Sequence, residues 1–149
     1  IAGPHPSSQE TQLFDVALAA LVRDMTLAQG PHLRLTMDLG VSDSVSPEHT
    51  ESVLLIVREA LSNCLQHSRA QQGFVTVQRQ NSALRIEIQD DGVGFDPDAA
   101  KKDGHGLTNM AARARAIGAE FTILSWPGHG VHIALDLPLS KGVSGHELT

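Results

Sequence analysis

A helical pattern between Ser52 and Ala70 constrains the fold of this chain more than any other stretch, because its two sides differ in chemistry. Apolar residues recur on one side with a helical period of about 3.6 residues: Val53, Val57, Ala60, Leu61 and Cys64. Glu59, Asn63 and His67 follow one another at four-residue steps, which places them in a narrow row on another side. Such a row is either a solvated face or part of a site, and Asn favours a site because it is a mediocre helix former. The pattern therefore predicts an amphipathic helix that packs on a core and presents a carboxylate, an amide and an imidazole together.

Length and charge limit the classes of protein that this chain can form. Its 149 residues suit one domain with a sizeable core. The sequence has 11 Lys and Arg against 17 Asp and Glu, a formal net charge of −6, and no basic cluster, so we expect no direct binding of nucleic acid. The single cysteine excludes an internal disulfide bond. No apolar run reaches the roughly 18 residues of a membrane-spanning helix.

The rest of the chain shows helical and strand periods in turn. Two further helices are expected, over residues 11–28 and 104–117. Five strands are expected, over residues 33–39, 74–80, 83–90, 121–125 and 131–137, of which the last four form two antiparallel hairpins. Residues 41–47 predict a loop, Ser46 before Pro47 is typical of a helix start, and Gly118 is typical of a helix end. The predicted class is therefore α+β, a two-layer sandwich in which helices cover one face of a mixed, mostly antiparallel sheet.

The strand over residues 83–90 ends in a carboxylate that is expected to point inward. Its inward face consists of Leu84, Ile86 and Ile88. The two-residue period of a strand places Asp90 next on the same side, where a carboxylate needs hydrogen-bond donors from the protein, water or a ligand. Gly92 and Gly94 follow, and glycine lets backbone approach closely. Because Asp-Gly is also a common turn pair, this stretch is either an ordinary turn or one wall of a binding site.

A glycine-rich stretch, Gly104-His105-Gly106-Leu107, opens the helix expected over residues 104–117. Backbone N–H groups at a helix start point outward and the helix dipole favours an anion, so this junction can hold a phosphate. It can equally be an ordinary helix start. Neither Gly-x-x-x-x-Gly-Lys-Ser/Thr nor Gly-x-Gly-x-x-Gly after a strand is present. The stretch therefore supports a phosphate site only in combination with the other motifs.

The combination of motifs, in this order and spacing, is more specific than its parts. It resembles the N, G1 and G2 boxes of the ATP-binding fold shared by gyrase, heat-shock chaperones, histidine kinases and mismatch-repair proteins. The matching motifs are Glu59-x-x-x-Asn63-x-x-x-His67, Asp90-x-Gly92-x-Gly94 and Gly104-x-Gly106-Leu107. The resemblance covers Ser46 to Pro138 and is greatest to sensor histidine kinases of the nitrate-sensor type. It implies a Bergerat-type ATP-binding fold and a catalytic domain over residues 11–139, between flexible segments 1–10 and 140–149.

This resemblance implies a role for each matching residue. Asp90 would accept a hydrogen bond from the adenine amino group, and Asn63 would bind the Mg²⁺ that bridges the phosphates. Glu59 would be the catalytic base or a polarising carboxylate, a role that an acidic neighbour of the phosphorylated histidine on another domain can share. The other implied nucleotide-binding residues are His67, Gly92, Gly94, Gly104, His105, Gly106 and Leu107.

The resemblance also implies a function with ATP and Mg²⁺ as cofactors. The γ-phosphoryl group would pass to a histidine on a separate dimerisation domain of the same kinase, for relay to a response regulator with a helix-turn-helix output domain. Catalysis would consist mainly of positioning and charge neutralisation. We expect a cytoplasmic module cut from its phosphoacceptor domain, with a membrane contacted only through other parts of a full-length sensor.

Two departures from the family pattern leave the strength of ATP binding open. Gln66 stands where the family often has Lys, and Val131 stands where it tends to have Thr, so we expect modest affinity. Three alternatives remain: a regulatory serine kinase of the same superfamily, a nucleotide-gated interaction module, and an ATPase of the chaperone and mismatch-repair kind. The short stretch between Phe95 and Gly104 argues against the last, whose lids are typically longer. A zinc site is disfavoured because no Cys or carboxylate cluster accompanies the scattered His67, His105, His129 and His132.

Overall fold

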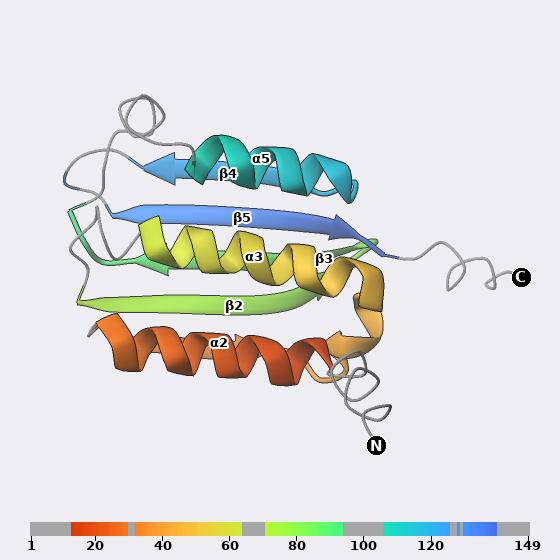
Figure 1. The fold of residues 1–149 in the computed structure, drawn as a ribbon, viewed down its shortest axis with the longest axis horizontal. Helices are drawn as coiled ribbons and strands as arrows, with labels where there is room; N and C mark the ends of the chain where they lie inside the picture. The colour runs from red at the N-terminus through yellow and green to blue at the C-terminus, as the bar shows by residue number, and fades with distance from the viewer. Residues whose placement is uncertain are drawn as a thin grey trace, which may run out of the picture.

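The computed structural model describes residues 13–29, 32–63, 71–93, 106–125, 128 and 130–139, which form a two-layer sandwich (Figure 1). The sheet layer contains β1 (His32–Met37), β2 (Gln72–Gln80), β3 (Ala83–Asp90), β4 (Glu120–Ser125) and β5 (Val131–Pro138). The helix layer contains α2 (Phe14–Gln29), α3 (Pro47–Asn63) and α5 (Gly106–Ala116), and a 3-10 helix, η1 (Val41–Ser44), precedes α3. The predicted α+β class is confirmed. Segments 1–10 and 140–149, expected to be flexible, lie outside the described residues.

The strands are arranged in the order β1-β2-β3-β5-β4. Both predicted hairpins are confirmed, because β2 pairs antiparallel with β3 and β4 pairs antiparallel with β5. The strand β5 also pairs with β3, which joins the two hairpins in one sheet, and β1 adds to β2 in parallel. The left-handed Asn81, with a φ of 54°, makes the tight turn between β2 and β3.

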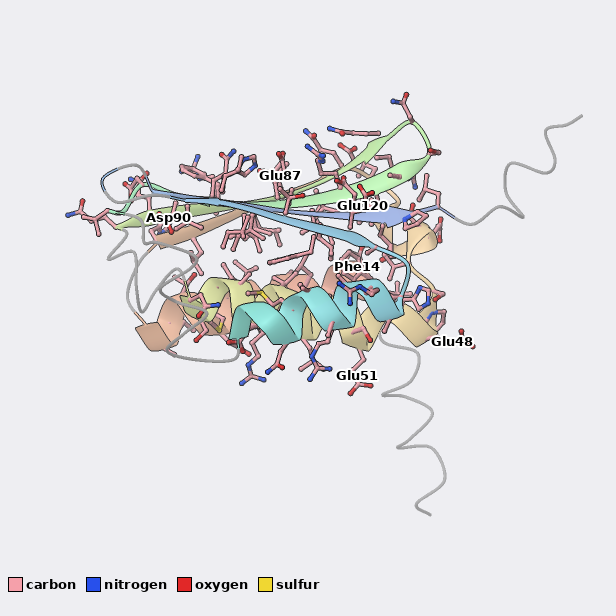
Figure 2. The ribbon with its side chains drawn as sticks, turned by 90° about the horizontal axis from the view of Figure 1, so that it is seen from above. Phe14, Glu48, Glu51, Glu87, Asp90 and Glu120 are labelled. Carbon is pink, nitrogen blue, oxygen red and sulfur yellow. The ribbon has the colours of Figure 1, made fainter. Side chains whose placement is uncertain are left out.

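The core fills the space between the helices and one face of the sheet (Figure 2). Leu84, Ile86 and Ile88 of β3 are at most 3% exposed, as the strand period predicts, whereas Glu87 lies on the opposite face. Burial of each such side chain contributes roughly 1.5–3 kcal/mol. The helices contribute Phe14, Leu18, Val22, Val53, Ile56, Val57, Ala60, Leu61, Met110 and Ala114 to the same buried cluster.

The predicted boundaries of two helices are confirmed by their hydrogen bonds. The helix α3 begins at Pro47, and the Ser46 hydroxyl accepts a hydrogen bond from the His49 N–H at 3.2 Å. After α5, Gly118 adopts a left-handed φ of 75°, and the Ala119 N–H donates to the Ala114 carbonyl at 2.8 Å. The Ser46 cap therefore fixes where α3 begins, and the Gly118 turn fixes where α5 ends.

The segment between β1 and α3 differs from the prediction in two ways. The strand ends at Met37, and Leu39, expected on its inward face, is 94% exposed in a turn. Residues 41–47, expected to be a loop, contain η1, whose Val41 is 1% exposed. The physical reason is Gly40, which adopts a left-handed φ of 75° and turns the chain back toward the core. This turn sends the apolar side chain of Val41 inward in place of Leu39.

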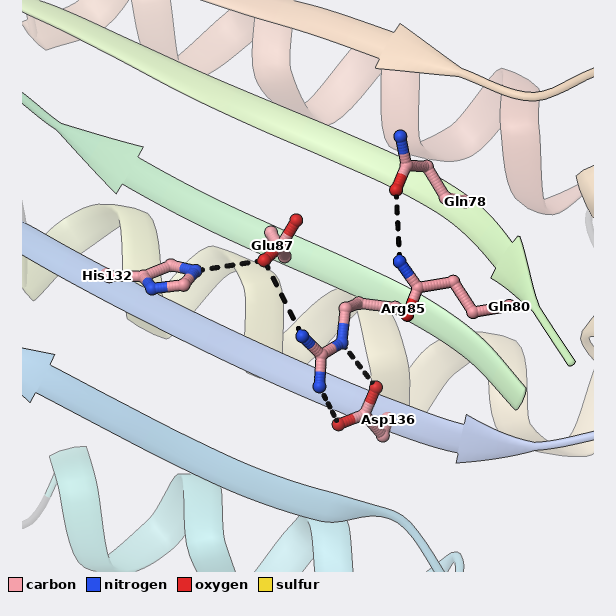
Figure 3. A network of polar contacts seen from close by, with 6 residues as sticks. All are labelled: Gln78, Gln80, Arg85, Glu87, His132 and Asp136. Atoms are coloured by element: carbon pink, nitrogen blue, oxygen red, sulfur yellow. Dashed lines mark hydrogen bonds and ion pairs between the residues drawn. The ribbon is translucent and has the colours of Figure 1, made fainter. Parts of the chain in front are cut away.

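The face of the sheet opposite the helices carries a polar network (Figure 3). The Arg85 guanidinium donates two hydrogen bonds to the Asp136 carboxylate, at 2.7 and 2.9 Å, and these bonds raise its pKa above the ordinary value. Glu87 lies 3.8 Å from the same guanidinium and 3.0 Å from His132 Nε2. The network bridges neighbouring strands β3 and β5 on the side away from the core.

Candidate functional site

The ends of two helices and of one strand lie together at one end of the sandwich. Figure 1 shows the C-terminal end of α3, the C-terminal end of β3 and the N-terminal end of α5 at the same end of the molecule. The residues at these ends are Asn63, Asp90 and Gly106, and each belongs to a different predicted motif. The fold therefore gathers the three motifs, although they are separated along the sequence.

Asp90 ends β3 on its inward side. The residue is half-buried, its Oδ1 accepts a hydrogen bond from the Gly92 N–H at 2.9 Å, and its Oδ2 is buried. In the register of the sheet, its neighbours are Gly73 on β2 and Val131 on β5. Neither neighbour carries a polar side-chain atom, so no polar side chain flanks the carboxylate on the two adjacent strands.

Two glycines that the sequence did not single out shape the surroundings of Asp90. A Cβ on Gly130 would lie 2.5 Å from the Asp90 backbone oxygen, and Gly130 has a left-handed φ of 73°. A Cβ on Gly73 would lie 2.7 Å from Leu33 Cδ2. The position of Gly130 therefore requires glycine, whereas at Gly73 only the flexible end of the Leu33 side chain is in the way. The available signal was weak: Gly130 lies in a turn, where glycine has many causes, and Gly73 opens a strand.

The sequence pattern also indicated no role for Asp91, the next residue. Its Oδ1 accepts hydrogen bonds from the Gln71 and Gln72 N–H groups, each at 3.0 Å. These backbone hydrogen bonds, with that from Gln72 the largest cause, lower the pKa of the carboxyl below its ordinary value. Its own N–H donates to the Gln72 carbonyl at 3.2 Å. Asp91 thus binds the start of β2 to the end of β3.

Glu59 and Asn63 lie one turn apart on α3, as predicted, and both are half-buried. The Asn63 side-chain nitrogen, Nδ2, is buried and has no hydrogen-bond partner among the described residues. A buried amide without a partner is costly, so a site for a polar ligand at this helix end would satisfy it. A hollow of about 90 Å³ is lined by Leu55, Arg58, Glu59, Asn109, Met110 and Arg113.

The remaining predicted site residues divide into two groups. Gly92 is half-buried beside Asp90, and Gly106 and Leu107 are the first residues of α5. The first backbone N–H groups of a helix have no partner within it, which suits an anion. Four predicted residues lie outside the described part of the chain: His67, Gly94, Gly104 and His105.

The sequence of this chain is similar to those of known proteins. Residues 48–141 match the family described as Histidine kinase-, DNA gyrase B-, and HSP90-like ATPase. Sensor protein VraS of Staphylococcus epidermidis is 34% identical over 130 residues, which cover 87% of this chain and 37% of that protein. Sensor protein VraS of Staphylococcus aureus is 33% identical over 130 residues, covering 87% and 38%. The chain thus spans less than half the length of these relatives.

Solved structures share the fold at lower sequence identity. The Erythrobacter litoralis EL346 blue-light activated histidine kinase has a TM-score of 0.76 and 21% identity, over 92% of this chain and 45% of that chain. Acinetobacter baumannii histidine kinase AdeS has a TM-score of 0.67 and 11% identity, over 86% and 66%.

The fold and the family match together define an ATP-binding domain. The chain belongs to the family of histidine kinase-, DNA gyrase B- and HSP90-like ATPases. The predicted family is confirmed, and the nitrate-sensor type stays a prediction. Among the described residues, no helix combines the length and the apolar character needed to cross a membrane.

The close approach at Gly130 yields the first prediction. Gly130→Ala forces a Cβ against the Asp90 backbone and should lower the free energy of unfolding by roughly 1–3 kcal/mol. Gly128→Ala is a matched control, because Gly128 also has a left-handed φ, of 87°, but its Cβ would meet nothing within 4 Å. Urea denaturation of both variants measures the difference. Equal losses in the two variants would show that the approach to Asp90 is not tight.

Proposed function

We propose that this chain is the ATP-binding catalytic domain of a two-component sensor histidine kinase. It binds Mg-ATP and gives the γ-phosphoryl group to a histidine on a separate dimerisation domain, from which a response regulator with a helix-turn-helix output domain receives it. The observation that carries the proposal is the meeting of Asp90, Asn63 and the start of α5 at one end of the sandwich. These three groups match two parts of Mg-ATP: Asp90 matches the base, and Asn63 and the start of α5 match the metal-bound phosphates.

Asp90 is the proposed adenine contact. A carboxylate accepts hydrogen bonds and donates none, so it pairs with the exocyclic amino group of adenine. Guanine carries an oxygen at the corresponding ring position, which a half-buried carboxylate would repel. Gly92 and Gly94 would let backbone approach the base. The site should therefore prefer adenine to guanine nucleotides.

Asn63 is the proposed Mg²⁺ ligand, and its surroundings fit that role. Its amide has a buried end without a partner among the described residues, which is the observation expected of a group that awaits a ligand. The amide oxygen and nitrogen exchange places by rotation of the side chain, so this end can present an oxygen to a cation. Mg²⁺ takes few protein ligands because it keeps several waters, and when bound it would neutralise charge on the phosphates.

Glu59 is the proposed catalytic carboxylate, one helical turn before Asn63 and half-buried. In this position it can polarise or accept a proton from an incoming acceptor. The other proposed nucleotide contacts are His67, Gly104, His105, Gly106 and Leu107. They follow from the family motif, and the helix start at Gly106 supplies N–H groups that suit a phosphate.

Asp90→Asn tests the adenine contact. The substitution keeps the shape but replaces one acceptor oxygen with a donor that faces the adenine amino group. Loss of a hydrogen bond to a charged group costs roughly 1.5–3 kcal/mol, so ATP should bind at least about tenfold more weakly. Calorimetric titration measures the change, with Asp43→Asn, at an exposed position in η1, as the control. A folded Asp90→Asn variant with parental affinity would disprove the contact.

Phosphoryl transfer in trans tests the proposed activity. Transfer needs the acceptor nitrogen and the γ-phosphorus nearly in line and roughly 3–3.5 Å apart, which a separate domain can present. With γ-labelled ATP, the chain alone should stay unlabelled, and adding a dimeric helical domain with an exposed histidine should give label that is acid-labile and base-stable. Replacing that histidine should abolish the label. Stoichiometric acid-labile label on the chain itself would contradict the proposal, and acid-stable label on a serine would favour a serine kinase.

A further inference from the structure

Asp91 joins the start of β2 to the end of β3, which bears the proposed adenine contact. Three hydrogen bonds connect it to the start of β2: two from the Gln71 and Gln72 N–H groups to its Oδ1, and one from its own N–H to the Gln72 carbonyl. Asp91 is also covalently attached to Asp90, which pairs in register with Gly73, the residue after Gln72. The contact therefore ties the strand end that bears Asp90 to the neighbouring strand.

Asp91 itself is unsuited to direct contact with a nucleotide. Asp91 is exposed. Because successive residues of extended chain point to opposite sides, its side chain faces away from the inward carboxylate of Asp90. Both of its side-chain hydrogen bonds go to backbone. An effect of Asp91 on nucleotide binding must then act through the position of its neighbours.

We propose that Asp91 is a positioning residue of the nucleotide site, whose carboxylate holds the Gln71–Gln72 backbone against the end of β3 and so fixes the position of Asp90. The proposal rests on the proposed function, because it assumes that Asp90 contacts the base of the nucleotide. Affinity is greater when a contact residue is held in place in advance, since ordering the chain on binding would weaken it.

The chemistry of the contact predicts which substitutions are tolerated. One oxygen accepts both N–H groups, and the Asn side chain retains such an oxygen with two lone pairs. Ala retains none. The lowered pKa of Asp91 agrees with this contact. The contact is fully present at pH values above the ordinary pKa of 3.8, and it weakens as the pH falls through the lower folded-state pKa.

Asp38, the residue after β1, provides a matched control at the other end of β2. Its Oδ2 accepts a hydrogen bond from the Arg79 N–H of β2, also at 3.0 Å, and its side chain is exposed as well. Asp38 thus makes the same kind of contact, a carboxylate on strand backbone. It differs in location, because Arg79 lies near the end of β2 that is remote from Asp90.

The experiment compares Asp91→Ala, Asp91→Asn and Asp38→Ala by urea denaturation and by calorimetric titration with a non-hydrolysable ATP analogue and Mg²⁺. Asp91→Ala should weaken binding by about tenfold, whereas Asp38→Ala should change it less than about twofold at a similar loss of stability. Asp91→Asn should restore most of the affinity. Should Asp91→Ala not fold, Asp91→Ser replaces it, because its shorter side chain cannot reach both N–H groups.

Parental affinity in Asp91→Ala, or an equal loss in Asp38→Ala, would overturn the positioning role and leave the proposed function intact. Failure of the parent chain to bind the analogue would overturn the proposed function itself. Amide hydrogen exchange at Gln71 and Gln72 without nucleotide adds a direct readout: it should accelerate in Asp91→Ala and not in Asp38→Ala. Unchanged exchange at both amides would also overturn the role.

Discussion

Apolar packing between the helix layer and one face of the sheet is the interaction on which the rest of this structure depends. The side chains of β3 and β5 that face inward form one buried cluster with the apolar sides of α2, α3 and α5. This packing fixes α3 over the centre of the sheet, so that its last turn and the end of β3 lie at the same end of the molecule. The polar row of α3 and the inward carboxylate of Asp90 are brought together by apolar contacts that involve neither of them.

The division between apolar core residues and polar site residues also explains how a carboxylate is kept at the edge of the core. Asp90 continues the inward side of β3 one step beyond the last buried apolar residue. Gly130 leaves room for the Asp90 backbone, and the Gly92 N–H donates a hydrogen bond to the Asp90 carboxylate. Asp91, on the outward side, binds the neighbouring strand. Two adjacent aspartates thus differ in role because a strand turns their side chains to opposite faces.

Most of the fold could be predicted from the sequence, because periodicity and turn residues are local signals. Asn81-Ser82 marks a hairpin and Ser46-Pro47 marks a helix start, and both predictions are confirmed. The failures have two causes: a turn that ends a strand early, and contacts between strands. Leu39 fits the strand period but is exposed, because Gly40 turns the chain first. Gly73, Gly130 and Asp91 depend on contacts between neighbouring strands, which no single stretch of sequence specifies. Asp90, Asn63 and Glu59 could be proposed from the sequence because each lies on a periodic element.

The central claim is that the C-terminal ends of α3 and β3 and the N-terminal end of α5 form one site for Mg-ATP. Calorimetric titration of the chain with non-hydrolysable analogues of ATP and GTP, each with and without Mg²⁺, tests it most directly. The account predicts that the ATP analogue binds at least about tenfold more tightly than the GTP analogue and that Mg²⁺ strengthens its binding. Failure to bind the ATP analogue, or equal affinity for the two bases, would contradict it.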